Sequence, residues 1–224
     1  MTYTQLPENM QNEFTKQYFE MLSKHRFSLG AKRVFDVVVS ALILLILSPF
    51  LLILALAVKL DSPGPVFYRQ VRVGRYNQDF KIYKFRTMVQ NADKIGPPLT
   101  MGKDPRITRV GSLIRKLRLD EFSQLLNVLN GSMSLVGPRP EVRRYVDAYT
   151  PEYMATLLIR PGITATSSIA FKDEDKLLNS GGDPEKIYVE KILPPKMALN
   201  LEYMKHISVL HDIKIMFQTV AAVI

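Results

Sequence analysis

One apolar run near the amino terminus limits the folds open to this 224-residue chain more than any other feature. The run extends over residues 34–60, no residue from Val37 to Val58 is charged, and this length reaches the roughly 20 residues that a helix needs to cross a bilayer. Ser48-Pro49 lies in the middle of the run, where proline removes a backbone hydrogen bond and kinks or breaks a helix. The run therefore predicts either a spanning helix or a re-entrant helix-break-helix hairpin.

The charges around this run do not decide between the two alternatives. Lys32 and Arg33 precede the run, and Lys59 follows its uncharged part. Because positive residues prefer the cytoplasmic side, this symmetry suits a hairpin that enters and leaves by one face. Asp36 lies one turn inside the run and is costly in lipid unless it is paired or stays among the headgroups. The 33 mostly polar residues before the run, with no small-residue cleavage site after it, exclude a cleaved signal peptide.

Composition restricts the chemistry of the remaining residues. The absence of cysteine excludes disulfides, thiolate catalysis and Cys-based zinc sites, and fits a chain with its bulk in the cytosol. The three histidines, His25, His206 and His211, lack metal-ligand spacing. A formal charge of +9 indicates anionic partners, which include nucleic acid, anionic lipid headgroups and phosphate-bearing substrates. Charge alone does not choose among these.

Outside the apolar run, the sequence predicts an α+β fold that is mostly helical with a small sheet. Residues 66–73 and 80–85 are rich in β-branched and aromatic residues around a turn, which predicts a hairpin. Residues 91–107 predict a loop. The predicted helices are an amphipathic segment within 8–27, then 113–129 with Ser112 as N-cap, 141–149, 151–159, 184–193 and a broken helix over 196–222. The last 12 residues are too short to span a bilayer, so they predict a packed or interfacial helix.

The segment "IRKLRLDEFSQLLNVL", residues 114–129, places Asp120 beside Glu121 among basic and apolar residues. On a helix, Asp120 joins a polar stripe beside the apolar face. Ion pairs from Lys116 to Asp120 and from Arg118 to Glu121, each worth about 0.2–0.5 kcal/mol, would explain the acids without any chemistry. Judged on this helix alone, the plain ion-pair interpretation is favoured.

Two basic motifs alter that balance. "SLVGPRPE" places Arg139 between two prolines, which stiffen the backbone. An arginine held on such a stiff loop suits bidentate binding of a phosphate. The alternative is that the motif is only the start of a helix. "KFRTM" places Lys84 and Arg86 on one face of a strand, where a solvated basic edge is the alternative. "GPPLTMGKD", residues 96–104, lacks the spacing and the Ser/Thr of a phosphate loop, and we reject it as one.

One chemistry uses all of these parts. A carboxylate attacks or positions a phosphoryl group, a divalent cation neutralises a diphosphate, and arginines hold its oxygens. A membrane anchor fits this chemistry if the acceptor is a lipid phosphate, because the acceptor then lies in the membrane. The competing hypothesis is a membrane-tethered basic module that binds nucleic acid or anionic lipid without catalysis. It leaves the carboxylate pair unexplained, and the sequence has no recognition-helix pattern or aromatic stacking ladder, so we expect no nucleic-acid partner.

Four stretches, in this order, carry the motifs of one protein family: "KRVFDVVVSALILLILSPFLLILALAVKLDSPGPVFYRQVRVG", "FKIYKFRTM", "LIRKLRLDEFSQLLNVLNGSMSLVGPRP" and "RPGIT". Through them the chain resembles the bacterial sugar transferase family of monotopic phosphoglycosyl transferases, which start the assembly of polysaccharides and glycoconjugates on a polyprenyl phosphate. The likeness runs from about Lys32 to the carboxyl terminus. Several ordered motifs in one chain are more specific than any of them alone.

This resemblance implies a membrane arrangement. A re-entrant helix over residues 32–60, broken at Ser48-Pro49, would follow an amphipathic segment over 1–31 and precede a cytosolic catalytic domain with interfacial helices over 61–224. The expected location is the bacterial inner membrane, with the catalytic domain on the cytoplasmic face. The chain looks like a minimal catalytic form, and a homo-oligomer is compatible with its sequence.

The resemblance also implies a ping-pong reaction. Asp120 would attack the β-phosphate of a UDP-sugar, release UMP and carry the phospho-sugar as an acyl phosphate. A polyprenyl phosphate, such as undecaprenyl phosphate, would then take up the phospho-sugar. Glu121 would help to hold Mg²⁺ with Asp120 or would move a proton. The sugar itself is not encoded in any motif.

Basic residues receive roles by the same resemblance. Arg115 looks like a ligand of the lipid phosphate, Arg139 looks like part of the nucleotide-sugar site, and Lys84 and Arg86 match the basic strand motif. Lys172 stands where the family commonly has a phosphate-binding arginine, and it keeps the charge but loses the bidentate fork. Phe122-Ser123 replaces the more usual Leu-Pro after the carboxylates, which we interpret as a change of local packing.

Overall fold

The computed structural model describes residues 2–92, 104–178 and 183–223, and in this part the chain is mostly helical, as predicted, with two small sheets where one was expected. The helices are α1 (Glu13–Lys24), α2 (Arg26–Asp61), α4 (Arg109–Lys116), α5 (Leu125–Leu129), α6 (Arg143–Val146), α7 (Thr166–Ala170), α8 (Glu174–Leu178), α9 (Pro184–Ile187), α10 (Leu193–Lys205) and α11 (Val209–Val223). The strands are β1 (Phe67–Val73), β2 (Asp79–Phe85), β3 (Ser134–Val136) and β4 (Gly162–Thr164). Short 3-10 helices are η1 (Tyr3–Gln5), η2 (Glu8–Met10), η3 (Arg75–Asn77), η4 (Leu119–Gln124) and η5 (Tyr153–Leu158), and a π-helical turn η6 (Tyr188–Ile192) joins α9 to α10.

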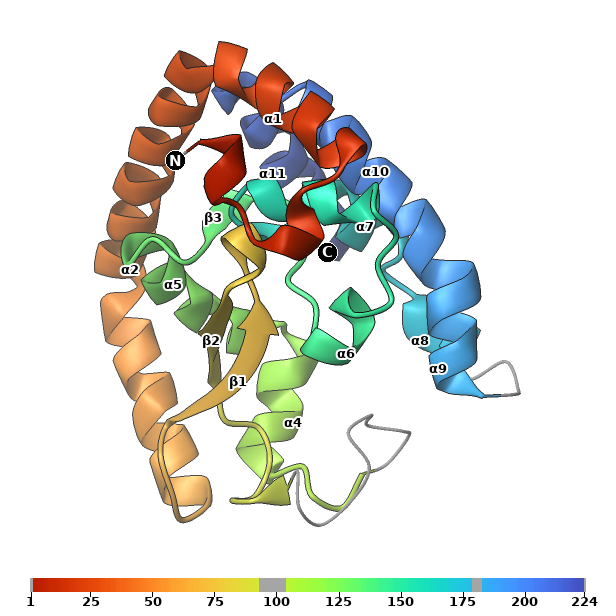
Figure 1. The fold of residues 1–224 in the computed structure, drawn as a ribbon. Helices are drawn as coiled ribbons and strands as arrows, with labels where there is room; N and C mark the ends of the chain where they lie inside the picture. The colour runs from red at the N-terminus through yellow and green to blue at the C-terminus, as the bar shows by residue number, and fades with distance from the viewer. Residues whose placement is uncertain (1, 93–103, 179–182, 224) are drawn as a thin grey trace.

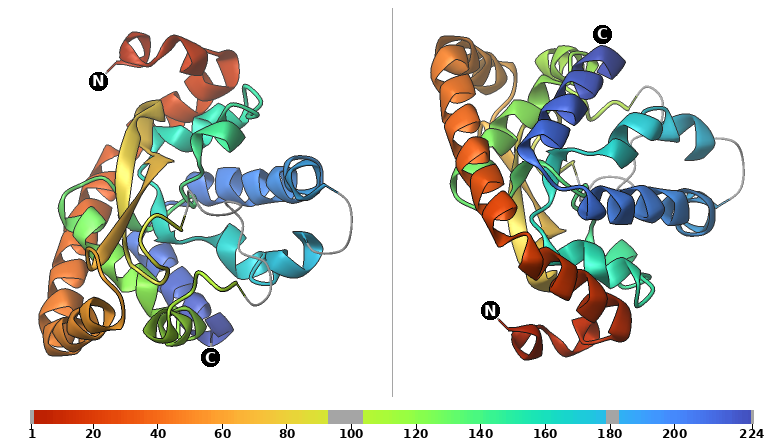
Figure 2. Two further views of the ribbon diagram at one scale, coloured as in Figure 1. Left: turned by 90° about the horizontal axis from the view of Figure 1, so that it is seen from below. Right: turned by 90° about the horizontal axis from the view of Figure 1, so that it is seen from above.

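The apolar run forms α2, which curves along one side of the molecule (Figure 1, Figure 2). Among the described residues, α2 is the one helix long and apolar enough to cross a membrane. It begins at Arg26, before the expected start at Lys32, and it continues through Ser48 and Pro49 without the expected break. Ser48 Oγ donates to the Leu45 carbonyl at 2.8 Å, and that carbonyl is the one that a backbone N–H at position 49 would have bonded. The hydroxyl therefore replaces the bond that proline removes, which explains why the helix bends rather than ends. The re-entrant arrangement stays a prediction.

A buried polar network ties α2 to the carboxyl-terminal part of the chain. Lys32 donates to Asp212 of α11 and lies 3.7 Å from Asp36. Asp36 accepts from Ser134 of β3 at 2.7 Å, and Asp212 accepts from the Tyr203 hydroxyl of α10 at 2.7 Å. All five side chains are buried. The charge of Asp36, which the sequence marked as costly in lipid, is thus paired within the protein.

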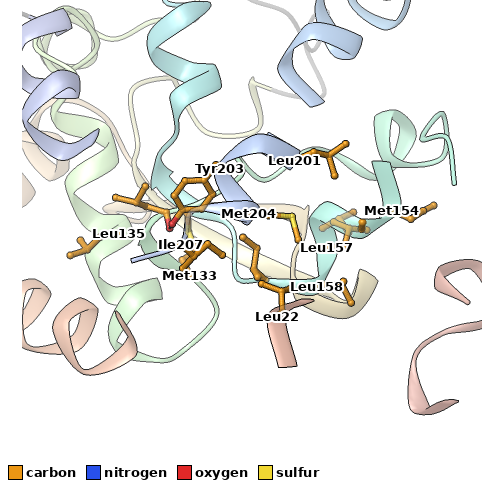
Figure 3. Packing of buried hydrophobic residues seen from close by; sticks show 14 of the residues in the cluster. Leu22, Met133, Leu135, Met154, Leu157, Leu158, Leu201, Tyr203, Met204 and Ile207 are labelled. Carbon is orange, nitrogen blue, oxygen red and sulfur yellow. The ribbon is translucent and has the colours of Figure 1, made fainter. Parts of the chain in front are cut away.

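The main hydrophobic core lies between α1, β3, η5 and α10. Figure 3 shows its side chains gathered between these elements, where Leu22 from α1 points toward Leu158 from η5 and Met204 from α10. Leu158 and Met204 are each only 2% exposed. This core fixes the carboxyl-terminal helices against the amino-terminal ones.

The first sheet is the predicted hairpin, in which β1 and β2 pair antiparallel with Tyr68 opposite Lys84. The second sheet, formed by β3 and β4 in parallel, was not predicted. A Cβ atom added to Gly162 would lie 2.1 Å from the backbone nitrogen of Gly137. Only glycine allows this approach, which brings the motifs "SLVGPRP" and "RPGIT" together.

The single helix predicted over 113–129 is wrong. Helix α4 begins earlier, with Thr108 rather than Ser112 as its N-cap, and ends at Lys116. Arg118 then adopts a left-handed conformation with φ 56°, which no α-helix accommodates, and the chain continues as η4 and α5. Gly131, with φ 90°, follows α5 as the predicted C-terminal glycine.

The other expected helices are partly confirmed. The regions predicted as 141–149 and 151–159 contain only the short α6 and η5, whereas 184–193 continues without interruption into α10. The expected break within 196–222 falls between Lys205 and Val209, and α11 is the expected carboxyl-terminal helix. Most of the loop expected over 91–107, together with the rejected phosphate-loop motif, lies outside the described residues.

Candidate active site

The carboxylate pair lies on η4, opposite the end of β2. Lys84 Nζ lies 3.7 Å from Asp120 Oδ2 and 3.2 Å from Glu121 Oε1, so one ammonium group faces both acids. Arg139 donates to Glu121 Oε1 through Nη2 at 2.6 Å and to Oε2 through Nη1 at 3.5 Å. The structure thus brings the adjacent Asp120 and Glu121 together with Lys84 and Arg139, which come from other segments of the sequence.

Two side chains of η4 and α5 hold β2 in place beside the carboxylates. The Asn127 side chain accepts a hydrogen bond from Tyr83 N at 2.8 Å and donates one to Lys81 O at 2.9 Å. It thereby satisfies backbone groups on the outer edge of β2, as another strand would. Ser123 Oγ lies 3.0 Å from Tyr83 O. Ser123 stands where the resemblance led us to expect a proline, and its hydroxyl donates a hydrogen bond that proline cannot make. Lys84 is therefore held facing η4.

The Arg139 loop is fixed from the opposite side by the β3–β4 pair. Gly137 N donates to Thr164 O at 3.0 Å and Gly162 N donates to Pro138 O at 2.9 Å, so backbone bonds flank the loop before Arg139. The carbonyl of Pro140 accepts from Arg72 at 3.2 Å. The stiff Pro-Arg-Pro backbone expected from the sequence is thus also anchored to β1 and β4.

The two acids have opposite electrostatic environments. Burial raises the pKa of Asp120 above its ordinary value, and Lys84 only partly opposes this effect. Burial would also raise the pKa of Glu121, but the charges of Arg139 and Lys84 outweigh it and hold that pKa well below its usual range. Glu121 is a fixed anion, whereas Asp120 is less tightly paired and retains oxygen lone pairs for other bonds.

The remaining predicted site residues lie at different distances from this centre. Arg115 donates from Nε to Thr87 Oγ1 at 2.8 Å, and its charge lowers the pKa of Asp120, so it is close to the site. Arg86 is buried, and its guanidinium donates to the carbonyls of Val58, Ser62 and Pro63 at the end of α2. The structure therefore gives Arg86 a role in holding α2, as Arg and Lys do at helix ends, and does not bring it to the carboxylates. Ser48 and Pro49 belong to α2, apart from this cluster.

A cavity of about 590 Å³ opens beside the carboxylates, between α2, η4, α7 and α11. Glu121, Arg139 and Lys172 line it, whereas Asp120 is not among the described residues that do. Arg118 also lines it, a residue that the sequence assigned only to an ion pair with Glu121. Neither that pair nor the expected pair between Lys116 and Asp120 is among the ion pairs of the described residues. The left-handed backbone that turns Arg118 to the cavity has no signal in the sequence.

The histidines give no metal centre. His25, His206 and His211 line a second cavity of about 510 Å³ that shares no lining residue with the first. Within the ranges that the structure describes, no group of three or more His, Asp or Glu side chains could hold a metal ion. Any metal at the carboxylates would need further ligands from a substrate.

Comparison with known proteins decides the family. The family description "Bacterial sugar transferase" matches residues 27–224, which is most of the chain and includes every residue of this site. The chain belongs to the bacterial sugar transferase family. The resemblance in the sequence motifs is therefore confirmed.

Three relatives within the family differ in length. The UDP-N-acetylgalactosamine-undecaprenyl-phosphate N-acetylgalactosaminephosphotransferase of Aeromonas hydrophila is 39% identical over 196 residues, covering 86% of this chain and 43% of that protein. The UDP-glucose:undecaprenyl-phosphate glucose-1-phosphate transferase of Escherichia coli K12 is 42% identical over 193 residues, covering 84% and 39%. The exopolysaccharide production protein PSS of Rhizobium leguminosarum is 38% identical over 201 residues, covering 87% and 95%. The chain thus spans about two-fifths of the first two relatives and nearly all of the third.

Proposed function

We propose that this bacterial sugar transferase transfers a sugar-1-phosphate from a UDP-sugar to a polyprenyl phosphate, as the first membrane step in the assembly of a polysaccharide or glycoconjugate. Asp120 attacks the β-phosphorus, the bond to the α-phosphate breaks, and UMP leaves. The polyprenyl phosphate then attacks the same phosphorus, which frees the Asp120 carboxylate and gives the polyprenyl-diphospho-sugar. The names of the Aeromonas and Escherichia relatives, which state undecaprenyl phosphate as acceptor, support this reaction.

The unequal pairing of the two acids carries the assignment of roles. Glu121 is engaged by Arg139 and Lys84, so its oxygens are poorly available for attack. Asp120 has Lys84 as its nearest cation, at 3.7 Å, and burial removes water from its carboxylate. A carboxylate that is charged but weakly solvated is the better nucleophile. Glu121 then fixes the two cations that face the phosphates.

Mg²⁺ fits this group of residues. The ion is typically held by one or two carboxylates together with substrate phosphates and water, and Asp120 and Glu121 offer that number of carboxylates. Lys84 Nζ already lies within 3.7 Å of both, which indicates a position favourable to a cation. When bound, the ion would neutralise the charge of the diphosphate. Arg139 keeps Glu121 oriented in either case.

The proposed location is the cytoplasmic face of the inner membrane, with α2 as the membrane segment. Apolar side chains are exposed along α2 and on two neighbouring helices, as they would be if these helices lay in the interface. Exposed apolar residues include Phe27, Leu45, Ile46, Leu52 and Leu60 on α2, Leu113 on α4 with Leu117 directly after it, and Leu210 and Phe217 on α11. This surface would keep the site close to a lipid acceptor.

The Asp120→Asn variant tests the nucleophile. The amide keeps the size but cannot form an acyl phosphate, so UMP release from the UDP-sugar is expected to fall on the order of 10⁴-fold or more. The intact mass of the wild-type protein incubated with UDP-sugar alone should increase by one phospho-sugar, and the variant should show no adduct. A panel of UDP-sugars in this assay also identifies the donor.

Asp147→Asn is the matched control, because Asp147 is exposed and follows α6 away from the carboxylates. It should release UMP as the wild type does. Chelation with EDTA should stop the release, and added Mg²⁺ should restore it. Full activity or an unchanged adduct in Asp120→Asn would contradict the assignment of Asp120 as nucleophile. Activity that persists in EDTA would contradict the requirement for a metal ion.

A further inference from the structure

The cavity beside Glu121 has an apolar part and a charged part. Ile43 of α2 and Met216 and Val220 of α11 contribute apolar side chains, together with Leu119 and Ile169. Charged side chains from η4, the Arg139 loop and the segment after α7 line the same cavity. A ligand that fits both parts is amphiphilic, with an apolar chain and a charged head.

The charges of this cavity are not balanced within the protein. Its ionisable lining consists of four cations and two acids, namely Arg118, Arg139, Lys172, Lys196, Glu121 and Glu174. Arg139 pairs with Glu121, and Lys196 pairs with Glu174. The side chains of Arg118 and Lys172 have no hydrogen bond or ion pair with any residue that the structure describes, and both residues are exposed. Two positive charges therefore remain for a ligand.

Arg118 is held in an unusual backbone conformation. Its φ of 56° and ψ of 25° lie in the left-handed region, which is unfavourable for a residue with a Cβ atom. Backbone strain of this kind concentrates at functional sites, where the position that it gives the side chain serves the function. Here the turn ends α4 and starts η4, and Arg118 lines the cavity together with Leu117 and Leu119.

We propose that Arg118, with Lys172, binds the phosphate of the polyprenyl phosphate acceptor, whose apolar chain lies along the part of the cavity lined by α2 and α11. A phosphate monoester carries about −1.5 to −2 charges at neutral pH, which matches the two unpaired cations. The planar guanidinium suits two of its oxygens. This inference rests on the proposed function and changes one of its expectations, because Arg115, the residue first expected at the lipid phosphate, does not line this cavity.

The two half-reactions separate the acceptor from the donor. Arg118→Gln should form the phospho-sugar adduct from UDP-sugar as the wild type does, because no acceptor takes part in that step. The concentration of undecaprenyl phosphate that gives half-maximal discharge of the adduct should rise about 10- to 100-fold, as expected for loss of a hydrogen bond to a charged group. Arg118→Lys should recover part of this loss. Lys116→Gln removes an exposed cation from α4 that does not line the cavity, and its discharge should match the wild type.

A binding measurement tests the site even if the wild type forms no adduct. Farnesyl phosphate and farnesol share one apolar chain, so the ratio of their dissociation constants isolates the phosphate. The wild type should bind farnesyl phosphate more tightly than farnesol, and Arg118→Gln should lose most of that preference. Inorganic phosphate alone should compete only weakly with farnesyl phosphate. Slower adduct formation with an unchanged acceptor dependence would assign Arg118 to the nucleotide sugar instead. An unchanged preference for farnesyl phosphate would overturn the inference.

Discussion

At the scale of single residues, the side chain of Lys84 shapes the site most directly. It faces both acids but lies closer to Glu121, and Arg139 adds a second cation on that acid alone. The asymmetry gives two adjacent carboxylates different protonation behaviour. One acid is a permanent structural anion, and the other is less stable in its charged form.

This difference predicts opposite effects on stability. The pKa of Glu121 is lowered by folding, so its stabilising effect is present above the ordinary glutamate pKa and is lost as the pH falls through the lower folded value. At neutral pH, Glu121→Gln should reduce the free energy of unfolding by about 1–3 kcal/mol, because Arg139 loses its partner. The pKa of Asp120 is raised, so its contribution is greatest in acid and is lost as the pH rises through the folded value. Asp120→Asn should therefore be at least as stable as the wild type at neutral pH.

Thermal unfolding in detergent at several pH values measures both effects. The difference between the wild type and Glu121→Gln should shrink as the pH falls below about 4, near the ordinary glutamate pKa. Equal destabilisation by the two substitutions at neutral pH would contradict the asymmetry. An inactive but stable Asp120→Asn would also show that its loss of activity does not come from unfolding.

Sequence reasoning identified Asp120, Glu121, Lys84 and Arg139, because their types and motifs suit phosphoryl chemistry. It could not predict which cation contacts which acid, since Lys84, the two acids and Arg139 come from three segments that only folding brings together. Arg118 was missed because nothing in "RKLRLDE" marks a left-handed residue, for which glycine or asparagine would have been the signal. The positive φ of an arginine is visible only in the structure.

At the scale of elements, the β3–β4 pair positions Arg139. The two strands have three residues each, and their close approach depends on Gly137 and Gly162. Strands so short have no periodicity to recognise, so the sequence predicted the hairpin of β1 and β2 but not this pair. The helix predicted over 113–129 failed for a related reason, since its apolar spacing continues across the turn at Arg118.

Gly162→Ala tests this pair. The added Cβ would meet the backbone of Gly137 at 2.1 Å, where no flexible side chain can move aside. The free energy of unfolding should fall by about 1–3 kcal/mol, and adduct formation should slow because the Arg139 loop shifts. Gly30→Ala is the control, because a Cβ at Gly30 of α2 meets nothing within 4 Å and alanine favours a helix by about 0.5–1 kcal/mol. Equal stability of the two variants would refute the requirement for glycine at 162.

At the scale of the whole molecule, the membrane arrangement is the main expectation still to be tested. A bent but continuous α2 is compatible with re-entry and with crossing, and the two differ in where the ends of the chain lie. If α2 re-enters, α1 before it and α9 after it face the same compartment. The core that α1 shares with η5 and α10 favours re-entry, since elements before and after α2 that pack together lie on the same side of the bilayer.

Single cysteines introduced into this cysteine-free chain can decide the question. Gln11, before α1, and Glu185, in α9, are both exposed. A membrane-impermeant maleimide should label both variants in inside-out vesicles and neither in intact cells with a permeable outer membrane. Labelling of the two positions from opposite sides would establish a spanning helix and refute re-entry.

The buried pairing of α2 with α11 also sets an order of events during synthesis. Asp212, the partner of Lys32, lies 180 residues later in the chain, so the ribosome completes the apolar helix long before it makes that carboxylate. Until then Lys32 and Asp36 have only each other as charged partners in this network, because Ser134 and Tyr203 also come later in the chain. If α2 is the membrane segment proposed above, we expect it to reach its final position only after the last helix has emerged, and a chain that ends before Asp212 would lack this contact.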